Sequence, residues 1–405
     1  MDKNKPTIVS LFSGAGGMDL GFKQAGFEIL FANDFFKEAV ETYRKNVSEN
    51  IIYGDITKIK SEEIPDNPDV IIGGFPCQGF SIANTNRSMK DERNFLYKEL
   101  LRIIKDKKPK FFVAENVKGL LSMEKGKVIN LIIKDFEDIG YRVDYKLLNA
   151  ANYGIPQLRQ RVIIIGNRIG FENPFPKTTH YINKLEKGKC KCPTVADTIG
   201  ELSNIPLSSE NIILPCGKSI SGHIAYTNVN DKFYGRKYDV NQIELCEYLK
   251  KYRKKSGLSN KKIAQALNMP QTKVDHWFRS DNNSGSIPNK EDYLALKKLL
   301  DLDDTYYKEL TEYEIKEIKF EQSLRITNWD RPSDTITATS PEIHINKTRR
   351  LSVRECARLQ TFPDDFEFCG TIDKQYKQIG NAVPVKLAKL IAKEILNIII
   401  SVDEN

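Results

Sequence analysis

Near its start the chain carries the run Thr7-Ile8-Val9-Ser10-Leu11-Phe12-Ser13-Gly14-Ala15-Gly16-Gly17, in which an apolar stretch ends abruptly in small residues. The apolar part predicts a buried strand, and the residues through Gly21-Phe22 predict a helix. Glycines between a strand and a helix let the backbone approach a ligand at the helix N-terminus, where nucleotide-like cofactors bind in doubly wound sheets. The match to a Gly-x-Gly-x-x-Gly loop is incomplete, because Asp19 stands where the third glycine would fall. For this motif alone, a plain tight turn is an equal alternative.

The region up to residue 172 continues the same alternation of short apolar runs with amphipathic stretches. Helical patterns cover Lys37 to Lys45, Asn94 to Lys105 and Lys127 to Ile139. Strands alternating with helices at this spacing predict an α/β fold with a doubly wound, mostly parallel sheet. The strands are expected at Ile8–Phe12, Ile29–Ala32, Ile51–Tyr53, Val70–Ile72, Phe111–Ala114, Tyr145–Leu148 and Val162–Ile165.

Acidic residues follow the next two predicted strands. Asp34 lies twenty residues after Gly14 at the end of the second strand, and Asp55 ends the third. An acid at this place in a doubly wound fold accepts hydrogen bonds from a ribose. The three strand ends together predict a cofactor site, which suits a nucleoside cofactor as well as a dinucleotide.

The fourth and fifth strands end in groups that can do chemistry. Cys77 follows Gly73-Gly74-Phe75-Pro76, which places it like a nucleophile, although a buried free cysteine is the alternative. Glu115 puts a carboxylate at the neighbouring strand end. Gln157, Arg159 and Arg161 alternate along one face of an extended segment, so their side chains can converge on one site.

The composition excludes several classes of protein. The 405 residues are 40% hydrophobic and 29% charged, as in ordinary soluble globular proteins. The most apolar stretch, Leu387 to Val402, contains three charged residues, so we expect no membrane helix. The charged start, Met1 to Pro6, is not typical of a secretory signal, and the expected compartment is the cytoplasm. Seven scattered cysteines predict no disulfide scaffold, and the pair Cys190 and Cys192 is too closely spaced for the usual zinc pairing, so we expect no metal.

After residue 172 prolines interrupt a polar, irregular stretch, which we assign to a second domain at residues 173–347. Within it, residues 242–300 form a helical insert, with helices predicted at Gln242 to Lys255, Asn260 to Leu267 and Gln271 to Phe278. The last two have helix-turn-helix spacing. Residues 250–279 hold nine basic residues and one acidic one, so their net charge of +8 equals that of the whole chain. Contact with DNA phosphates is favoured over a merely solvated face, because charge and spacing coincide.

The chain carries six motifs in the following order: Leu11 to Gly17, Gly74-Phe75-Pro76-Cys77-Gln78, Glu115-Asn116-Val117, Gln157-x-Arg159-x-Arg161, Arg354-Glu355-x-Ala357-Arg358-Leu359-Gln360-x-Phe362-Pro363, and Gln378-Ile379-Gly380-Asn381-Ala382-Val383-Pro384. In sequence and in order, these motifs resemble those of the DNA (cytosine-5)-methyltransferase family of bacterial restriction-modification systems. Together they span residues 7 to 385, and the unmatched region, between Arg168 and Thr348, is where that family keeps its variable target-recognition domain. The resemblance implies that residues 1–172 bind the cofactor and catalyse, and that residues 348–405 return to complete the small domain and pack the last helix on the catalytic domain.

The resemblance also implies a mechanism. The Cys77 thiolate would add to C6 of a cytosine flipped out of duplex DNA, which turns C5 into a nucleophile toward the methyl group of S-adenosylmethionine. Glu115 would hydrogen-bond the N3 and amino edge of the base, and Arg161 with Arg159 would support the O2 side. Loss of the C5 proton would free Cys77 and leave S-adenosylhomocysteine as the product. The base for that step is not assigned, and water is the default.

For the remaining site residues the resemblance implies two groups. Asp34 stands where the family more often has Glu, which shortens its reach and keeps the acceptor. The cofactor-binding group is Phe12, Gly14, Gly16, Gly17, Asp34, Asp55, Ile56, Pro76 and Asn381. The DNA-contacting group is Gln78, Ser81 and Arg93, to which the helical insert adds its exposed candidates Gln271, Thr272, Lys273 and His276.

The expected function is thus methylation of a specific duplex DNA sequence by a monomer, as the protective partner of an endonuclease acting on the same site. The helical insert could read bases, grip phosphates only, or repress the enzyme's own gene. Two rival functions remain at this point. One is methylation of a tRNA cytosine, and the other is a helix-turn-helix regulator whose methyltransferase half is silent.

Overall fold

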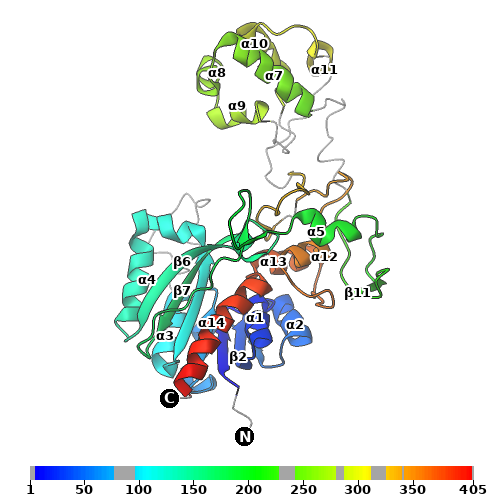
Figure 1. The fold of residues 1–405 in the computed structure, drawn as a ribbon. Coiled ribbons are helices and arrows are strands. Elements are labelled where there is room, and N and C mark those ends of the chain that lie inside the picture. Colours follow the sequence, from blue (N-terminus) through cyan, green and yellow to red (C-terminus); the bar gives the residue numbers. More distant parts are fainter. Residues whose placement is uncertain are drawn as a thin grey trace. The chain divides into compact units, whose positions relative to one another are not determined.

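The computed structural model describes residues 5–76, 96–227, 242–279, 287–311, 325–339 and 342–403. Its centre is a seven-stranded sheet with the order β3-β2-β1-β4-β5-β7-β6, shown in Figure 1. Each predicted strand is present. The strands are β1 (Thr7–Leu11), β2 (Glu28–Asp34), β3 (Ile51–Tyr53), β4 (Val70–Gly73), β5 (Phe111–Val117), β6 (Arg142–Asn149) and β7 (Gln160–Asn167).

The sheet is parallel from β3 to β5 and antiparallel at the other edge. Strands β6 and β7 are joined by a short connection that contains only a 3₁₀ turn (Ala150–Tyr153), which is too short for a parallel crossover. They therefore pair antiparallel, and β7 inserts between β5 and β6. The prediction of a doubly wound, mostly parallel sheet is confirmed.

Helices cover both faces of the sheet (Figure 1). On one face, α3 (Leu96–Lys107) and α4 (Lys127–Glu137) bury apolar side chains against β1, β4, β5 and β7. Helix α4 does so with Val128, Ile129, Ile132 and Phe136, which share one side of the helix. The other face carries α1 (Gly17–Ala25), α2 (Lys37–Asn46) and the final helix α14 (Val385–Asp403).

The C-terminal region returns to the sheet. A capping box at Ser352 starts α12 (Val353–Leu359), and α13 (Ile372–Asn381) follows. Helix α12 ends at Leu359, because Gln360 already leaves the helical conformation as its cap and Thr361 has a φ of 62°. The close packing of α1 on α14 depends on Gly21, where an added Cβ would lie 2.5 Å from the Cβ of Ala388.

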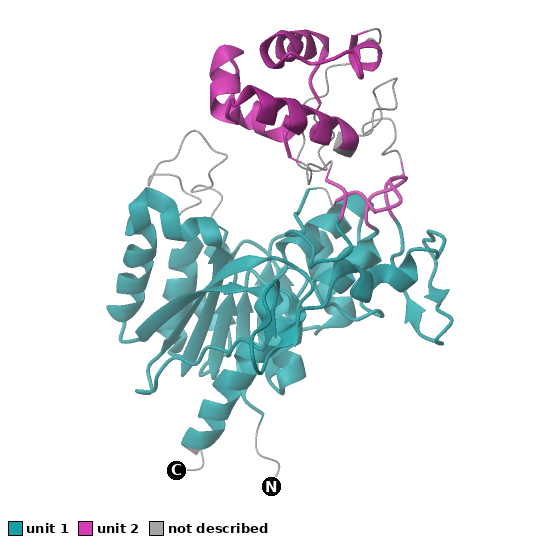
Figure 2. Cartoon of the chain, turned by 45° about the horizontal axis from the view of Figure 1, so that its top comes forward, with its two compact units in different colours: residues 1–224, 328–340, 352–405 teal, residues 225–327, 341–351 magenta. Residues whose placement is uncertain are grey.

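The chain divides into two compact units (Figure 2). The first is Met1–Ile224, Asn328–Ser340 and Ser352–Asn405, and the second is Ala225–Thr327 and Pro341–Leu351. Residues 173–224, which the sequence analysis assigns to the irregular domain, thus lie in the first unit. They hold only short elements, namely β8 (His180–Tyr181), β9 (Cys190–Lys191), α5 (Val195–Ile199), β10 (Ile212–Ile213) and β11 (Ser219–Ile220). Arg358 of α12 anchors residues 173–224 to the C-terminal region, because its Nη1 lies 2.6 Å from Oε1 of Glu201.

Among its described residues, the second unit contains five helices around their own apolar core. Trp277 is 2% exposed and belongs to this core. The helices are α7 (Gln242–Ser256), α8 (Asn260–Ala266), α9 (Gln271–Trp277), α10 (Lys290–Leu300) and α11 (Tyr307–Thr311). None of the helices in the described ranges is long and apolar enough to cross a membrane.

Candidate functional site

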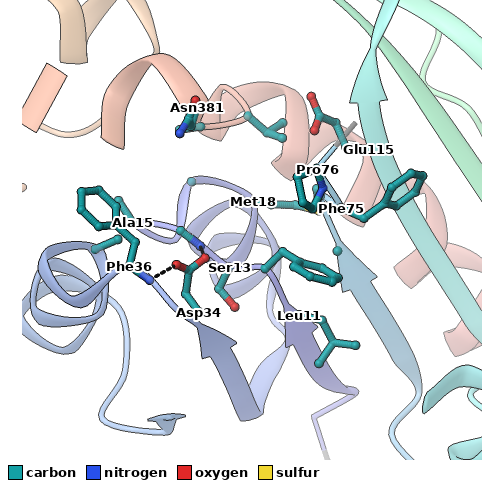
Figure 3. A pocket seen from close by; sticks show the side chains of 18 of the residues that line it. Leu11, Ser13, Ala15, Met18, Asp34, Phe36, Phe75, Pro76, Glu115 and Asn381 are labelled. Carbon is teal, nitrogen blue, oxygen red and sulfur yellow. Dashed lines mark hydrogen bonds between the residues drawn. The ribbon is translucent and has the colours of Figure 1, made fainter. Parts of the chain in front are cut away.

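A cavity of about 480 Å³ lies at the carboxyl ends of β1, β2, β4 and β5. Its size is typical of a small-molecule site, and its position is where doubly wound sheets bind their ligands. Figure 3 shows Asp34, Pro76, Glu115 and Asn381 around it, contributed by four separate parts of the chain. Strand ends of the sheet and the C-terminal segment at residues 377–383, here called the return segment, thus meet in one site.

The glycine loop between β1 and α1 forms one wall. Gly14 has a φ of 56°, and no atom within 4 Å would meet a Cβ there, so the loop leaves room for a ligand. Gly17 has the opposite role, because a Cβ on it would lie 2.6 Å from the carbonyl oxygen of Val383. The backbone of the loop therefore faces the cavity, while the return segment packs directly on the start of α1. Phe12, Gly14 and Gly17 line the cavity, and Gly16 is the left-handed cap that starts α1.

Asp34 at the end of β2 braces this loop. Its Oδ2 accepts the N–H of Gly14 at 2.8 Å and its Oδ1 accepts the N–H of Phe36 at 2.7 Å; Figure 3 marks the bond to Phe36. Burial raises the pKa of Asp34, and the N–H groups of Phe36 and Gly14 oppose that shift. Each carboxylate oxygen can still accept a further hydrogen bond, so Asp34 is able to hold a hydroxyl group in the cavity.

Aromatic rings that the sequence analysis did not single out complete this end. Phe35 lines the cavity, and 68% of its surface is exposed. Phe36 also lines it, and the Nζ of Lys377 lies 4.8 Å from the centre of its ring. The signal in the sequence was the aromatic pair directly after Asp34. With Phe12 these rings form flat surfaces suited to a purine base.

Two predicted cofactor residues are not brought to the cavity. Asp55 caps a 3₁₀ turn (Ile56–Lys58), where its Oδ1 accepts the N–H and hydroxyl of Thr57. Ile56 is 3% exposed and packs in the core beneath the sheet edge. Neither is part of the described cavity lining. The cause is local, because the chain turns immediately after the short strand β3 and directs Asp55 to its own backbone.

The opposite end of the cavity carries an ion pair. The Nε of Arg161 on β7 lies 2.7 Å from Oε1 of Glu115 on β5, and both side chains are nearly buried. Arg161 also donates from Nη1 to the carbonyl oxygen of Gln160. A Cβ on Gly74 would lie 3.2 Å from Oε2 of Glu115, so the glycine leaves space around the carboxylate. Both charged groups are therefore held at the cavity, where they could form hydrogen bonds with a polar ring.

Pro76 lines the cavity directly before Cys77. The preceding residue is anchored, since the amide of Asn116 donates to the carbonyl oxygen of Phe75 at 3.0 Å. Asn116 in turn accepts the N–H of Val117. The segment leading to Cys77 is therefore tied to the strand that carries Glu115. Cys77 itself, like Gln78, Ser81 and Arg93, lies outside the described residues.

Arg159 occupies a different place from Arg161. It is 1% exposed, and its Nη1 and Nη2 donate to the carbonyl oxygens of Ile336 and Gly380. Burial lowers the pKa of its guanidinium, and the charge of Arg161 lowers it further. Of the two arginines, the structure brings Arg161 to the cavity and leaves Arg159 behind the wall.

Asn381 lines the cavity at the end of α13. The amide of Gln360 holds this end by donating to the carbonyl oxygens of Ile379 at 2.7 Å and Ala382 at 3.2 Å. The side-chain oxygen of Gln360 accepts a hydrogen bond from the side-chain amide of Gln157. Three motifs that are far apart in the sequence therefore meet behind the cavity wall.

A buried acid lies under the glycine loop. Asp19 is 1% exposed, and its Oδ1 accepts the hydroxyl of Tyr43 at 2.8 Å. Burial raises the pKa of Asp19 to about 6, while hydrogen bonds from Ser10 and Tyr43 oppose the shift. The position that breaks the glycine pattern thus carries a carboxyl group that ties α1 to α2.

The DNA-contacting candidates in the helical insert lie on or near one helix. Gln271, Thr272 and Lys273 are exposed on the first turn of α9, and His276 is half-buried. The Nζ of Lys273 is 2.8 Å from Oδ2 of Asp292, which restrains it. Elsewhere, the thiol of Cys192 is buried and donates to the carbonyl oxygen of Ile155, whereas Cys190 is exposed. Among the described residues no group of three or more His, Cys, Asp or Glu side chains could hold a metal ion.

S-adenosylmethionine, the cofactor that the resemblance implies, fits the residues present. The open backbone at Gly14 offers space along the glycine loop, and Asp34 offers an acceptor for ribose hydroxyls. The three phenylalanines offer apolar faces for adenine. The cavity of about 480 Å³ accommodates a molecule of that size.

Comparison with known proteins identifies the family. The family model for C-5 cytosine-specific DNA methylases matches residues 6–397. The chain is 37% identical over 404 residues to the Type II methyltransferase M.NgoFVII of Neisseria gonorrhoeae, covering 98% of this chain and 87% of that protein. It is 37% identical over 394 residues to the Type II methyltransferase M.FnuDI of Fusobacterium nucleatum, covering 96% and 93%.

Solved structures agree in fold. The S. pombe Dnmt2 methyltransferase superposes with a TM-score of 0.55 at 15% identity, covering 98% of this chain and 99% of that one. The sequence motifs, the cavity with its ion pair and the full-length relatives lead to one conclusion. The chain belongs to the C-5 cytosine-specific DNA methylase family and is a DNA (cytosine-5)-methyltransferase.

Proposed function

We propose that the chain methylates C5 of a flipped-out cytosine in one short duplex sequence, with Cys77 as nucleophile and Glu115 and Arg161 as the groups that hold the base. The observation that carries this assignment is the Glu115 and Arg161 ion pair, which borders the same cavity as Pro76, the neighbour of Cys77. An isolated cytosine edge presents a donor and acceptors to such a pair. S-adenosylmethionine supplies the methyl group when bound.

The residues around the pair support this division of labour. A carboxylate fixed by a guanidinium is preorganised, so it costs little reorganisation when charge develops on a bound ring. Asn116 positions the Phe75-Pro76 backbone, and hence the entry to Cys77, relative to Glu115. Arg159 belongs to the scaffold behind the cavity wall in this proposal, because both its Nη groups are used by main-chain carbonyls.

For the cofactor we propose a binding set of Phe12, Phe35, the glycine loop, Asp34 and Asn381. Asp34 would accept the ribose hydroxyls, and the phenylalanine rings would flank the adenine. Asp55 and Ile56 would then contribute only by shaping the sheet edge. Isothermal titration with S-adenosylmethionine tests the set, since Phe35→Ala should weaken binding while Tyr53→Ala, an exposed aromatic outside the lining, should not.

The helical insert is proposed to contact duplex DNA through α8 and α9. The two helices pack together through the buried Ile263 and Val274, and the amide of Asn260 donates to Oδ1 of Asp275 at 2.9 Å. The four-residue connection and this hydrogen bond support a helix-turn-helix unit with Gln271 and Thr272 at its exposed leading end. Because Lys273 is restrained by Asp292, we assign base reading to Gln271 and Thr272 first.

The wider setting follows from the relatives, which are Type II methyltransferases. We propose a restriction-modification role in the bacterial cytoplasm, with the enzyme acting as a monomer beside an endonuclease of the same site. Light scattering of the purified chain, alone and with DNA, tests the monomer.

The deciding experiment is incubation with S-adenosylmethionine and unmethylated genomic DNA, followed by base-resolution mapping of 5-methylcytosine. Methylation confined to one short context supports the proposal, and transfer only to RNA contradicts it. The full-length variant Gln271→Ala/Thr272→Ala is mapped in parallel. If it methylates the same context at the same rate, the insert does not read bases, whereas relaxed or altered contexts support reading.

A further inference from the structure

Behind the cavity wall, the first unit contains a crossing of two chain segments that the reaction itself does not explain. One segment is 333–338, which lies just after the chain re-enters the first unit at Asn328 from the second unit. The other is the end of α13, where Gly380 and Asn381 line the cavity. Arg159 is bonded to both.

The crossing is unusually close. A Cβ on Gly380 would lie 2.3 Å from the carbonyl carbon and oxygen of Thr337 and 2.4 Å from the nitrogen of Ala338. The backbone of the segment therefore rests directly on Gly380, with no side chain between them. A displacement of the segment must move the end of α13 or break this contact.

Arg159 bridges the crossing from below. Its Nη1 donates to the carbonyl oxygen of Ile336 at 3.1 Å and its Nη2 donates to that of Gly380 at 2.9 Å. Only a forked, planar guanidinium presents two donors in this way, and a lysine ammonium cannot replace it. The Nε of Arg159 has no hydrogen-bond partner among the described residues, so the side chain is held by these two carbonyls.

The segment is also bonded to residues 156–158, which directly precede Arg159. The N–H of Ile336 donates to Oε1 of Gln157 at 2.9 Å, and the N–H groups of Leu158 and Ser333 bond to the carbonyls of Ser333 and Pro156. The segment is thus attached by an isolated parallel bridge between Gln157 and Ser333 and by these hydrogen bonds. A displacement of this segment that starts in the second unit would therefore be transmitted to Arg159 and Gly380.

We infer that Arg159 is a positioning residue that couples DNA engagement by the second unit to cofactor binding, by joining the 333–338 segment to the Gly380-Asn381 wall of the cavity. This inference rests on the proposed function. Coupling of this kind is reciprocal, so a duplex that tightens cofactor binding is itself bound more tightly when the cofactor is present.

The test is the ratio of the S-adenosylmethionine dissociation constants without and with a short duplex that carries the methylated context. We expect a ratio of roughly 5 to 100 for the wild type, within the usual span of such couplings, and a ratio within about twofold of one for Arg159→Lys. Arg142→Lys is the matched control, because Arg142 lies exposed on β6 and pairs with Asp144 and Glu172 instead. Its ratio should equal that of the wild type.

Gly380→Ala is a second variant, because its added methyl group would displace the 333–338 segment from Gly380 while residue 159 remains an arginine. It should lower the ratio as well, and thermal unfolding of each variant without ligands shows that it is folded at the assay temperature. A wild-type ratio retained by both variants would overturn the inference, as would a wild type without coupling. Failure of the wild type to bind the cofactor at all would instead overturn the proposed function.

Discussion

The Nε of Arg161 and the Oε1 of Glu115 are 2.7 Å apart at the edge of the cavity, although 46 positions separate the two residues in the sequence. The antiparallel pairing of β5 with β7 creates this contact, because Val117 is opposite Arg161 and Glu115 is opposite Ile163. Diagonal neighbours across an antiparallel pair are within reach of long side chains. The ion pair is therefore a direct product of the strand register.

Replacing Glu115 by Gln should lower kcat by about 10²- to 10⁴-fold, since the charge that stabilises the bound ring is lost while the shape is kept. Single-turnover methyl transfer to duplex DNA measures the effect. Glu99→Gln is the control, because Glu99 pairs with Arg102 on α3 away from the cavity. Equal rates for the two variants would remove Glu115 from the reacting groups.

Cys77→Ser should lower turnover by at least ~10³-fold and leave DNA binding largely intact, because a serine hydroxyl is a far weaker nucleophile than a thiolate. Methyl transfer and gel-shift affinity are compared on the same duplex. Cys216→Ser, at an exposed position, should behave as wild type in both assays. Normal turnover of the Cys77 variant would end its assignment as nucleophile.

Asp19→Asn should change how stability depends on pH. The pKa of Asp19 is raised from 3.8 to about 6, so the ionised carboxylate is disfavoured in the folded chain and its cost is present above pH 6. This destabilisation decreases as the pH falls through about 6 toward 3.8, because the carboxyl group of Asp19 becomes protonated in the folded chain. The variant should thus exceed the wild type by roughly 2 to 3 kcal/mol near pH 8, with the difference shrinking toward pH 4.

Urea unfolding at pH 8, 6 and 4.5 tests the Asp19 prediction. The amide can still accept the hydroxyl of Tyr43, so the comparison isolates the charge. Asp138→Asn, on the surface after α4, serves as the control. Parallel pH curves for wild type and Asp19→Asn would contradict a raised pKa.

Gly21→Ala should destabilise the first unit by about 1 to 3 kcal/mol, despite the higher helix propensity of alanine. The new methyl group would meet the Cβ of Ala388 at 2.5 Å and the carbonyl oxygen of Val385 at 2.7 Å. Denaturant unfolding measures the change. At Gly54, where no atom lies within 4 Å of an added Cβ, alanine should cost less than about 0.5 kcal/mol.

Lys261→Ala and Lys262→Ala should each reduce the slope of log K against log salt for duplex binding by about one. Both side chains are exposed on the first turn of α8, beside the proposed reading helix. Binding is titrated over several salt concentrations by fluorescence anisotropy. Lys298→Ala, exposed on α10, provides the comparison, and an equal slope change there would mean that the insert attracts DNA only by its overall charge.

Most of the sheet could be read from the sequence, because buried strands are short apolar runs and each run ends at a residue that breaks the pattern. The glycine loop, Asp34 and Glu115 were found in the same way, since the carboxyl ends of parallel strands share one edge. Helix α13 was missed as a separate element, because its buried residues Tyr376 and Ile379 are surrounded by polar ones.

What the sequence alone determined is thus the order of the motifs, the alternation of strand and helix, and the chemical kind of each strand-end residue. The tertiary structure decided which of those residues meet. It turned Asp55 to its own backbone, buried Arg159 against two carbonyls and exposed Phe35 in the cavity. The reason is physical, since local pattern fixes which face of a strand a residue takes, whereas contacts between distant segments depend on register and packing.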